Sequence, residues 1–496
     1  MDDGTLLAAV DLGSNSFRLE IGKIRNGHIE RVEYLKETVR LGAGLNEEKY
    51  LDDPSMQMGF QALGRFAERL QGFPKRHVRA VATQTLREAK NQQEFVQRGQ
   101  DILGYPIEII PGLEEARLIY QGVAHLLPQS DEKRLVVDIG GRSTEFVTGR
   151  RYTSQQLASF RVGSVSWSTK YFKDGELTRS RFDKAITAAQ AILDEALDLF
   201  PKGTWDIAYG SSGTAGAVSE VLLACEQSDG IITLSGLQWL MDRLVKAQHV
   251  DQVDLPGLKP DRRPVIGGGV SVLFAVMDLF GIAELHPAQG ALRQGAMFDL
   301  LARDEDTDIR EQTVQGLQLR FGVDKAQANR VDGVASHFFS QISVPNHRQD
   351  RTSNKLRWAS LLHEIGAIVS HSQAALHGAY LMEHVDAPGF TQEELHRMSS
   401  LILAQRGKLK RVNDKLDDPL FVKQLLCLRL ATLLCHNRRS PDVSALTLQL
   451  KDEKRLVMAI ERTWIEEHPQ SWWLLQEEAS HWQRHEFDYR LKVVDQ

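Results

Sequence analysis

Two short segments of the sequence combine glycine with hydroxyl side chains in the same order, each directly after an apolar run. Asp11-Leu12-Gly13-Ser14-Asn15-Ser16 follows the first run, and Asp138-Ile139-Gly140-Gly141-Arg142-Ser143-Thr144 follows the second, 127 residues later. Glycine lets the backbone approach a phosphate closely, and the N–H and hydroxyl groups of such a turn donate hydrogen bonds to phosphate oxygens. We therefore predict that both segments bind phosphate.

The residues around these segments predict two β-hairpins. Leu7 to Val10 and Leu135 to Val137 are strand-like before the turns, and Phe17 to Ile21 and Glu145 to Thr148 are strand-like after them. The matching offsets favour an internal duplication over two unrelated turns. Two facing copies would form a cleft that holds one anion from both sides.

Two further glycine-rich segments follow apolar runs. Gly210-Ser211-Ser212-Gly213-Thr214 follows Ile207 to Tyr209, and Gly267-Gly268-Gly269 precedes a predicted helix from about Val270 to Phe280. We add Ser212, Gly213 and Thr214 to the candidate phosphate contacts, and the second segment places a helix N-terminus where it favours an anion. Taken alone, each is equally well interpreted as a plain strand-to-helix connection.

Carboxylates accompany both turns and predict a metal ion. Asp11 precedes the first turn, and Asp138 and Glu145 flank the second. A carboxylate repels bare phosphate, so its presence makes sense if a divalent cation, or water ordered by one, lies between them. We assign Asp138 and Glu145 to Mg²⁺ or its waters, with Asp11 in support.

Two adjacent glutamates, Glu114 and Glu115, open a predicted helix after Pro111-Gly112. Neighbouring helical residues point about 100° apart, so only one of the two carboxylates can face a given site. Such a carboxylate can orient or deprotonate an attacking water. Both residues are equally well interpreted as acids that the helix dipole favours.

Three arginines lie near these segments, and phosphoryl transfer needs cations that neutralise charge on oxygen. Arg87 follows a threonine-rich turn, Arg117 lies two residues beyond Glu115, and Arg161 precedes Val162-Gly163-Ser164. We include Arg87 and Arg161 in the site. Arg117 has the alternative role of a structural ion-pair partner on its helix.

Composition narrows the class of protein. The 496 residues are 42% hydrophobic and 25% charged, with a formal net charge of −6, which argues against a chain that mainly coats nucleic acid. We expect no signal peptide and no membrane span, because the start is acidic and the best apolar candidate, Leu425 to Leu434, is short and interrupted. Three cysteines without a metal or disulfide spacing fit a reducing cytoplasm.

The sequence character changes near residue 305. Before it, short β-rich runs alternate with helical stretches, which is typical of an α/β architecture, and after it helical periodicity dominates. The acidic stretch Arg303 to Asp308 is interpreted as a linker or a capped helix start. We predict domains at 1–125, 126–304, 305–440 and 441–496, the last a small α+β domain.

Four motifs together resemble a known family. Val10 to Phe17, Ala82 to Arg87, Gly112 to Arg117 and Asp138 to Glu145 resemble, in order and spacing, the exopolyphosphatase/guanosine pentaphosphate phosphohydrolase family. That family is a branch of the superfamily of actin, sugar kinases and heat-shock chaperone ATPases. The resemblance implies two duplicated ribonuclease-H-like (actin-like ATPase) domains, then an all-helical domain similar to His-Asp phosphohydrolases and a small C-terminal domain.

The resemblance also implies roles. Glu115 would activate or orient the attacking water, Arg87 would be the functional arginine, Mg²⁺ would be the cofactor, and the chain would form a homodimer. One position departs from the family pattern, because Arg142 stands where a third glycine is usual. Arginine suits phosphate, so we expect a phosphate contact there, although its side chain can instead crowd the site.

The helical region has two further features. His363-Glu364 stands where the His-Asp fold has His-Asp, and this replacement of Asp argues against a metal site. Residues 401–440 contain nine Lys or Arg against three Asp. Their densest part, the basic patch Arg406, Lys408, Lys410 and Arg411, is a candidate for holding a long polyanion; an ordinary solvated surface is the alternative.

These observations predict an exopolyphosphatase that processively removes terminal phosphate from inorganic polyphosphate. The first alternative is a guanosine pentaphosphate 5′-phosphohydrolase, and the second, from another class, is a non-hydrolytic ATP-binding switch. We expect no sequence-specific nucleic acid partner.

Overall fold

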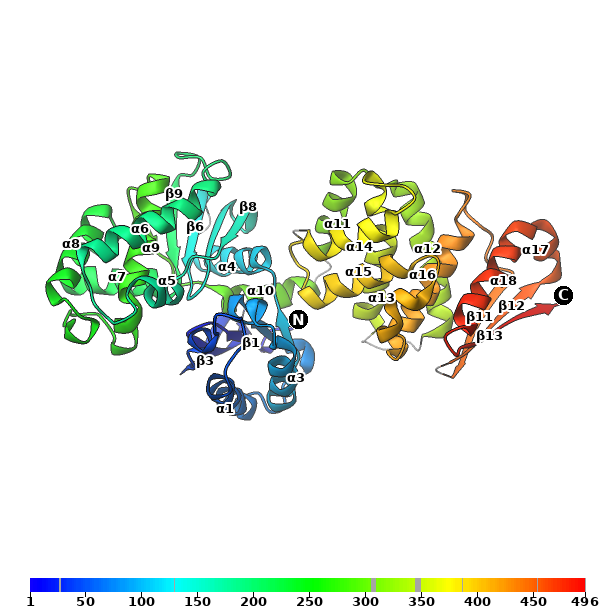
Figure 1. Ribbon diagram of the computed structural model, residues 1–496, viewed down its shortest axis with the longest axis horizontal. Coiled ribbons are helices and arrows are strands. Elements are labelled where there is room, and N and C mark those ends of the chain that lie inside the picture. Colours follow the sequence, from blue (N-terminus) through cyan, green and yellow to red (C-terminus); the bar gives the residue numbers. More distant parts are fainter. Residues whose placement is uncertain are drawn as a thin grey trace. The chain divides into compact units, whose positions relative to one another are not determined.

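The computed structural model describes residues 1–25, 28–128, 130–304, 309–343, 349–385, 387–452 and 454–495. The chain divides into two compact units, Met1–Asp308 and Ile309–Gln496 (Figure 1). Of the predicted linker Arg303 to Asp308, the last four residues lie outside the described residues, and the first two end a helix.

The first unit contains two five-stranded sheets with the same topology. The first has the order β3-β2-β1-β4-β5, and the second has the order β8-β7-β6-β9-β10. The strands are β1 (Leu6–Leu12), β2 (Ser16–Arg25), β3 (His28–Thr38), β4 (Val78–Ala82), β5 (Ile107–Ile109), β6 (Lys133–Ile139), β7 (Thr144–Arg150), β8 (Thr153–Phe160), β9 (Ile207–Ser211) and β10 (Leu285–Pro287). In each sheet the first three strands in sequence are antiparallel, and the last two pair in parallel.

The two predicted hairpins are confirmed, and so is the duplication. Leu12 pairs with Phe17 across the first turn, and Ile139 pairs with Thr144 across the second. The offset of 127 residues therefore relates both the turns and the register of their strands. The central strands β1 and β6 are buried almost throughout, because helices cover both faces of each sheet.

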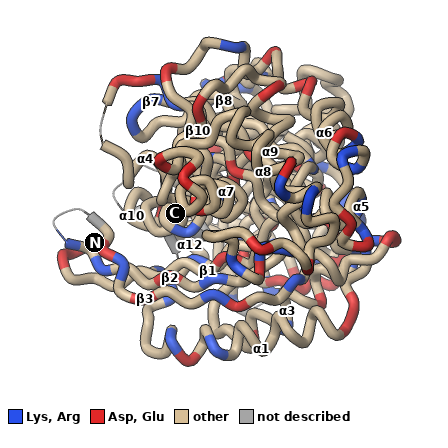
Figure 2. Tube along the Cα trace, turned by 90° about the vertical axis from the view of Figure 1, so that its left-hand side faces the viewer, with Lys and Arg blue, Asp and Glu red and all other residues tan. Residues whose placement is uncertain are grey.

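Helices complete the first unit. They are α1 (Asp53–Arg69), α2 (Gln84–Glu88), α3 (Gln92–Leu103), α4 (Gly112–Leu126), α5 (Ser164–Tyr171), α6 (Arg179–Leu193), α7 (Ser212–Ala224), α8 (Leu234–Ala247), α9 (Ile266–Phe280) and α10 (Leu292–Asp304). Helix α1 shows why such segments are helical: the Asp52 side chain caps its first turn, and Met56, Phe60 and Leu63 form one buried face. Figure 2 shows α1 and α3 below strands β1 to β3.

Helices α4 and α10 pack tightly against each other between the two sheets. Helix α4 also contacts β7 and β8 of the second sheet, whereas α10 contacts β1 of the first sheet. A Cβ atom at Gly122 would clash with the carbonyl of Ala291, and one at Gly295 would clash with the carbonyl of Leu118. Glycine therefore lets the two backbones touch, and α4 holds its first turn, with both glutamates, against both halves of the unit.

The most apolar helix of the first unit differs from the prediction. Within the described residues, Pro260–Phe280 is long and apolar enough to cross a membrane, so Leu425 to Leu434 was the wrong candidate. In the most apolar stretch of this segment, 67% is buried inside the unit, as in the core helix of a soluble protein. Its glycines Gly267 to Gly269 lie inside the first turn of α9, which begins four residues earlier than predicted.

The second unit combines helices with a small sheet. Its helices are α11 (Ile309–Arg320), α12 (Lys325–Ile342), α13 (Gln349–Leu361), α14 (Ala374–His384), α15 (Gln392–Ala404), α16 (Pro419–Leu434), α17 (Arg462–Glu467) and α18 (Pro469–Gln483), and its sheet has the order β11 (Leu446–Asp452), β12 (Arg455–Glu461) and β13 (Asp488–Val494). One continuous core joins helices and sheet, from Val314 to Tyr489. The predicted fold class is thus confirmed, with the C-terminal sheet packed on the helical part.

Candidate active site

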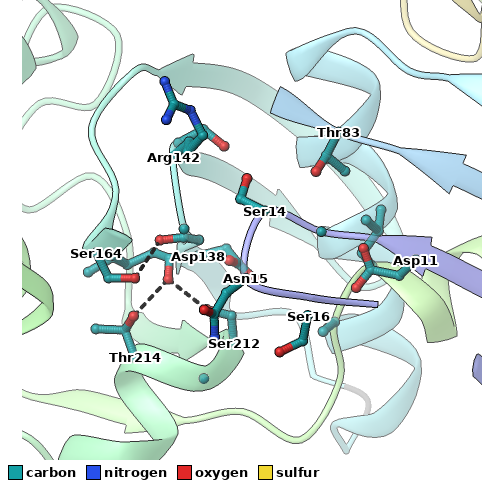
Figure 3. Close-up of a pocket in the computed structure, with 18 of the residues that line it drawn as sticks. Asp11, Ser14, Asn15, Ser16, Thr83, Asp138, Arg142, Ser164, Ser212 and Thr214 are labelled. Carbon is teal, nitrogen blue, oxygen red and sulfur yellow. Dashed lines mark hydrogen bonds between the residues drawn. The ribbon is translucent and has the colours of Figure 1, made fainter. Parts of the chain in front are cut away.

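Both glycine-rich turns line one small cavity of the first unit, of about 90 Å³ (Figure 3). The predicted phosphate contacts in its lining are Gly13, Ser14, Asn15, Ser16, Gly140, Gly141, Arg142, Ser143, Ser212, Gly213 and Thr214. Asp11, Asp138 and Glu115 line it as well. The two turns also touch each other, because a Cβ atom at Gly141 would lie 2.9 Å from that of Ser14.

The first turn is held by the segment that follows β3. The Gly42 N–H donates to the Ser14 carbonyl at 2.8 Å, and the Arg40 N–H donates to the Asn15 carbonyl at 2.9 Å. The Thr85 hydroxyl donates to Ser14 Oγ at 2.8 Å. Because the two carbonyls point outward to these donors, the turn keeps its own N–H groups and hydroxyls for the cavity.

The second turn rests on the start of α5. The Ser164 N–H donates to the Gly140 carbonyl at 2.9 Å, and the Val165 N–H donates to the Gly141 carbonyl at 2.8 Å. A Cβ atom at Gly163 would lie 2.5 Å from the backbone of both Gly141 and Arg142. Only glycine fits there, so Gly163-Ser164 is a support of the phosphate turn that the sequence analysis missed.

Ser212 and Thr214 line the cavity at the start of α7, yet their hydroxyls serve the turn. Both donate to the carbonyl of Ile139, at 2.8 and 2.9 Å (Figure 3). Ser212 also has a φ of 66°, a left-handed conformation that is costly for a residue other than glycine and is often found at functional sites. In this structure these hydroxyls hold the second turn.

Gly267 to Gly269 do not line the cavity, so they give no support to the predicted anion site. A Cβ atom at Gly268 would lie 2.5 Å from the Ser164 carbonyl and the Ser168 nitrogen. Gly268 instead lets α9 pack closely against α5, and thereby helps to place the start of α5 under the second turn.

Glu115 lies in the first turn of α4 and faces the cavity, with 7% of its surface exposed. The pKa of Glu115 is raised to about 7, chiefly by burial; Arg87 opposes the shift, and the nearby charges of Asp138 and Asp11 contribute to it. Its Oε2 accepts a hydrogen bond from Arg87 Nη1 at 2.8 Å, and Oε1 accepts none from the described part of the chain. A buried carboxylate with a near-neutral pKa and a free oxygen is suited to accept a proton.

Arg87 does not line the cavity but fixes Glu115 from behind. Its Nη1 also donates to the Ile110 carbonyl at 2.7 Å, and its Nε and Nη2 donate to Gln84 Oε1 at 3.1 and 2.7 Å. The guanidinium is thus oriented by groups of α2 and of the segment before α4. In this geometry Arg87 positions the carboxylate.

Glu114 points away from the cavity into a buried ion-pair cluster. Arg117 donates to both of its oxygens, at 2.7 and 2.9 Å, and also pairs with Asp299 of α10. Arg79 donates to Asp299 at 2.6 Å and to Glu114 at 3.3 Å. All four side chains are at most 3% exposed, so Arg117 has the structural role left open above.

The three carboxylates assigned to Mg²⁺ lie on paired strand positions. Asp138 pairs with Glu145 across β6 and β7, and Asp11 pairs with Arg18 across β1 and β2. Burial raises the pKa of both Asp138 and Glu145, and their mutual repulsion adds to the shift of Glu145. Glu145 does not line the cavity, and its Oε1 accepts a hydrogen bond from Ser159.

This carboxylate set fits Mg²⁺. Mg²⁺ usually takes one or two protein carboxylates and fills its other positions with water and phosphate oxygens. Within the described residues, no group of three or more His, Cys, Asp or Glu side chains is placed to hold a metal by itself. Asp138 faces the cavity, and a cation there would compensate the cost of burying its charge.

Two predicted phosphate contacts, Thr144 and Arg161, lie outside the cavity lining, and a third, Arg142, turns its side chain away. The Thr144 hydroxyl donates to the Val162 carbonyl at 2.6 Å and is buried away from the cavity. Arg161 is 73% exposed and lies 3.9 Å from Glu88. Arg142 borders the cavity, but its guanidinium bonds Glu88 and the Gly42 carbonyl and points away from Asp138 (Figure 3).

Three arginines that the sequence analysis missed face the cavity: Arg18, Arg262 and Arg293. Arg18 is the repeat equivalent of Glu145, 127 residues earlier, so the duplicated register could have identified it. Arg293 lies 3.4 Å from Asp11 and 3.2 Å from Glu20. Arg262 lies over Gly213, where a Cβ atom would clash with it, and pairs with no acid in the described chain.

A second cavity of about 410 Å³ shares these three arginines. Lys36 and Lys259 also line it, and they pair with Asp261 at 2.5 Å and with Glu220 at 2.9 Å. Burial lowers the pKa of Arg262, and the like charge of Arg18 adds to this effect. Arg18 and Arg262 are thus two close cations whose charges the neighbouring acids do not fully balance, and they are placed to receive an anion.

The second unit carries the basic patch and the histidines. Arg406, Lys408, Lys410 and Arg411 are exposed and form no ion pair with an acid of the described chain. His363 is buried, whereas His371 and His384 are exposed, and no metal-binding group forms among the described residues.

Comparison with solved structures finds proteins that are similar to part of this chain. A crystal structure described as an exopolyphosphatase-like protein is 25% identical, with a TM-score of 0.54, over 60% of this chain and 98% of that chain. The exopolyphosphatase of Cytophaga hutchinsonii is 21% identical with the same coverage and TM-score, which shows the fold alone. The Aquifex aeolicus PPX-GPPA enzyme is 25% identical over 59% of this chain and 98% of that one, with a TM-score of 0.49.

Two family models match successive parts of the sequence. The model of the Ppx/GppA phosphatase family matches residues 20–304, more than half of the chain, and the model of Ppx/GppA phosphatase domain III matches residues 309–479. The first match covers the second glycine-rich turn together with Glu115 and Arg87, and it begins after the first turn. The chain therefore belongs to the Ppx/GppA phosphatase family.

Proposed function

We propose that the chain is an exopolyphosphatase that processively hydrolyses the terminal phosphate of inorganic polyphosphate. The observation that carries this proposal is that Glu115 and both glycine-rich turns line one small cavity. The adjoining cationic cavity supports it, because the terminal phosphate of a chain fits the first cavity and its next phosphates fit the second. The membership of the family makes hydrolysis of a phosphoanhydride the expected reaction.

The residues of the first unit suggest how the reaction proceeds. The N–H groups of the two turns bind the oxygens of the terminal phosphate, and Arg18 and Arg262 offset their charge. Glu115 accepts a proton from water through its free oxygen while the water oxygen bonds to phosphorus. The bond from phosphorus to the bridging oxygen breaks, and orthophosphate and a shortened chain are released.

Mg²⁺ is the proposed cofactor. Asp138 would hold it, with Glu145 and Asp11 acting through ordered water. When bound, Mg²⁺ would neutralise charge on the phosphoryl oxygens.

A second candidate function is the removal of the 5′-phosphate of guanosine pentaphosphate. The observation that favours it is that Tyr34, Gly216 and Ala217 are among the residues that line the second cavity, so that an aromatic ring is available to a nucleoside. Phosphate release from polyphosphate, guanosine pentaphosphate and ATP separates the possibilities. Preference for polyphosphate supports the proposal, preference for guanosine pentaphosphate supports the second candidate, and ATP binding without hydrolysis of either supports the ATP-binding switch.

Arg87→Met is expected to move the pH dependence of kcat/KM to higher pH. The Arg87 charge and hydrogen bond favour the ionised form of Glu115, so their loss raises the pKa of Glu115 further. The carboxylate is then ionised only at higher pH, and the midpoint should rise by about one unit or more. Arg87→Lys, which keeps the charge, should shift it less. An unchanged midpoint with a higher KM would instead mean that Arg87 binds phosphate directly.

Neutralising the basic patch is expected to weaken long chains selectively. With Arg406, Lys408, Lys410 and Arg411 all changed to Gln, fewer counterions are released on binding. The KM for long polyphosphate should rise about tenfold, and its dependence on salt should become shallower, while tripolyphosphate is unaffected. Arg439→Gln, an exposed cation outside the patch, is the control. An unchanged KM and salt dependence would make the patch an ordinary solvated surface.

We also propose a cytoplasmic homodimer. Light scattering of the purified chain tests the stoichiometry, and fractionation of cells tests the location.

A further inference from the structure

The second unit contains a cavity of its own, of about 450 Å³. Its lining comes from α12, the turn after α13, the segment leading into α14 with the start of that helix, the segment after α15, and the turn after α16. All of these segments belong to Ile309–Gln496. The cavity is therefore complete within one unit and separate from the candidate active site.

Positive charge dominates the lining of this cavity. Arg406, Arg411 and Arg438 line it against a single acid, Glu364. Glu364 is already bound to Arg438 at 2.9 Å, and Arg438 also pairs with Asp324 at 2.8 Å. Arg406 and Arg411 thus remain without an acidic partner in the described chain, and their guanidinium groups can bind an anion.

A buried histidine gives the cavity a specific chemical feature. His363 is 2% exposed, and its Nδ1 lies 2.7 Å from the Ser360 carbonyl. A carbonyl only accepts, so Nδ1 carries the proton and the neutral ring presents a lone pair at Nε2. This Nε2 is buried and has no hydrogen-bond partner. An unpaired buried acceptor in the lining of a cationic cavity is costly unless a ligand donates to it.

The charges around His363 favour its neutral ring and disfavour a metal ion as the group that binds at Nε2. Burial lowers the pKa of His363, and the charges of Arg406 and Arg438 lower it further, against the opposite effect of Glu364. The remaining titratable side chains of the lining are His371, His436 and Arg411. A cation bound at Nε2 would be repelled by three arginines, whereas an anion that carries its own proton would satisfy all of these groups.

We propose that this cavity binds a compact phosphate that retains a proton, either free orthophosphate or the terminal group of a phosphate chain. The phosphate O–H donates to His363 Nε2, and Arg406 and Arg411 donate to the ionised oxygens. A terminal phosphate has a pKa of about 6 to 7, so it carries this proton part of the time at neutral pH. Sulfate carries the same charge without a proton and cannot donate.

Nitrogen NMR of the full-length chain with ¹⁵N-labelled histidine tests this proposal, since His363 lines this cavity and its signal reports on what binds there. That signal is assigned by its absence in His363→Gln. Orthophosphate should shift the Nε2 resonance, and sulfate at equal concentration should not. If only tripolyphosphate shifts it, the ligand is a chain end. Equal shifts with sulfate, or none with any phosphate, would overturn the proposal.

Substitutions at two exposed positions test the proposal without changing the buried His363. Arg406→Gln and Arg411→Gln should each weaken the affinity for phosphate, measured from the concentration dependence of the Nε2 shift, about tenfold or more. This is the usual effect of losing a charge-assisted hydrogen bond. Arg439→Gln, an exposed cation outside the cavity, should leave the affinity unchanged. Unchanged affinity in both cavity variants would overturn the proposal. The measurement uses binding alone, so it stands or fails independently of the proposed hydrolysis.

Discussion

Glu115→Gln is expected to lower kcat for phosphate release from polyphosphate by about 10²- to 10⁴-fold, the usual contribution of a general base. Glutamine keeps the shape of the side chain but cannot accept a proton from water. The KM and the affinity for the chain should change little, because the turns and arginines that bind phosphate remain in place. Steady-state kinetics and calorimetric binding of polyphosphate to the variant measure both quantities.

A matched control separates this role from a general effect of helix dipoles. Glu94 is also an acid in the first turn of a helix, α3, but it is exposed and outside both cavities of the first unit. Glu94→Gln should leave kcat unchanged. If Glu115→Gln kept more than a tenth of the wild-type kcat, water would be activated by another group, and the proposed mechanism would be wrong.

The parts of the site that repeat were predictable from the sequence. The shared offsets of the two turns predicted both hairpins, because a strand, a glycine turn and a second strand are determined by local residues. The same offset extends to Arg18 and Glu145, so the strand register contained one more functional position than the sequence analysis used. Periodicity likewise distinguished the α/β part from the helical part.

Features that depend on distant segments could not be predicted in this way. Arg142 turns to Glu88 and Gly42, which lie in the other half of the unit, so its phosphate contact could not be judged from its own loop. Gly267 to Gly269 looked like an anion loop, but they serve the packing of α9 on neighbouring segments, with Gly268 against α5. Arg262 was missed because its position over Gly213 results from tertiary packing rather than from a local motif.

The choice between Glu114 and Glu115 also depends on contacts with distant segments. The sequence places the two carboxylates about 100° apart on one helix, but it does not say which direction leads to the site. The structure separates them: Glu115 faces the cavity, while Glu114 joins Arg79, Arg117 and Asp299 in a cluster that links α4 to α10. The same substitution at these two neighbouring positions should therefore have opposite consequences.

Glu114→Gln is expected to lower the free energy of unfolding of the first unit by about 3 to 5 kcal/mol, the usual cost of removing one partner from a buried ion pair. Arg79 and Arg117 would keep their charges in a buried place with Asp299 as the remaining fully buried acid. Glu115→Gln removes a carboxylate whose raised pKa already marks its burial as unfavourable, so it should not destabilise the unit at pH 8. Because a chain with two units need not unfold in one step, hydrogen exchange of the α4 and α10 amides is the suitable measurement. Faster exchange in Glu114→Gln alone is the expected result, and equal exchange in both variants would contradict the assignment of Glu114 to structure and Glu115 to chemistry.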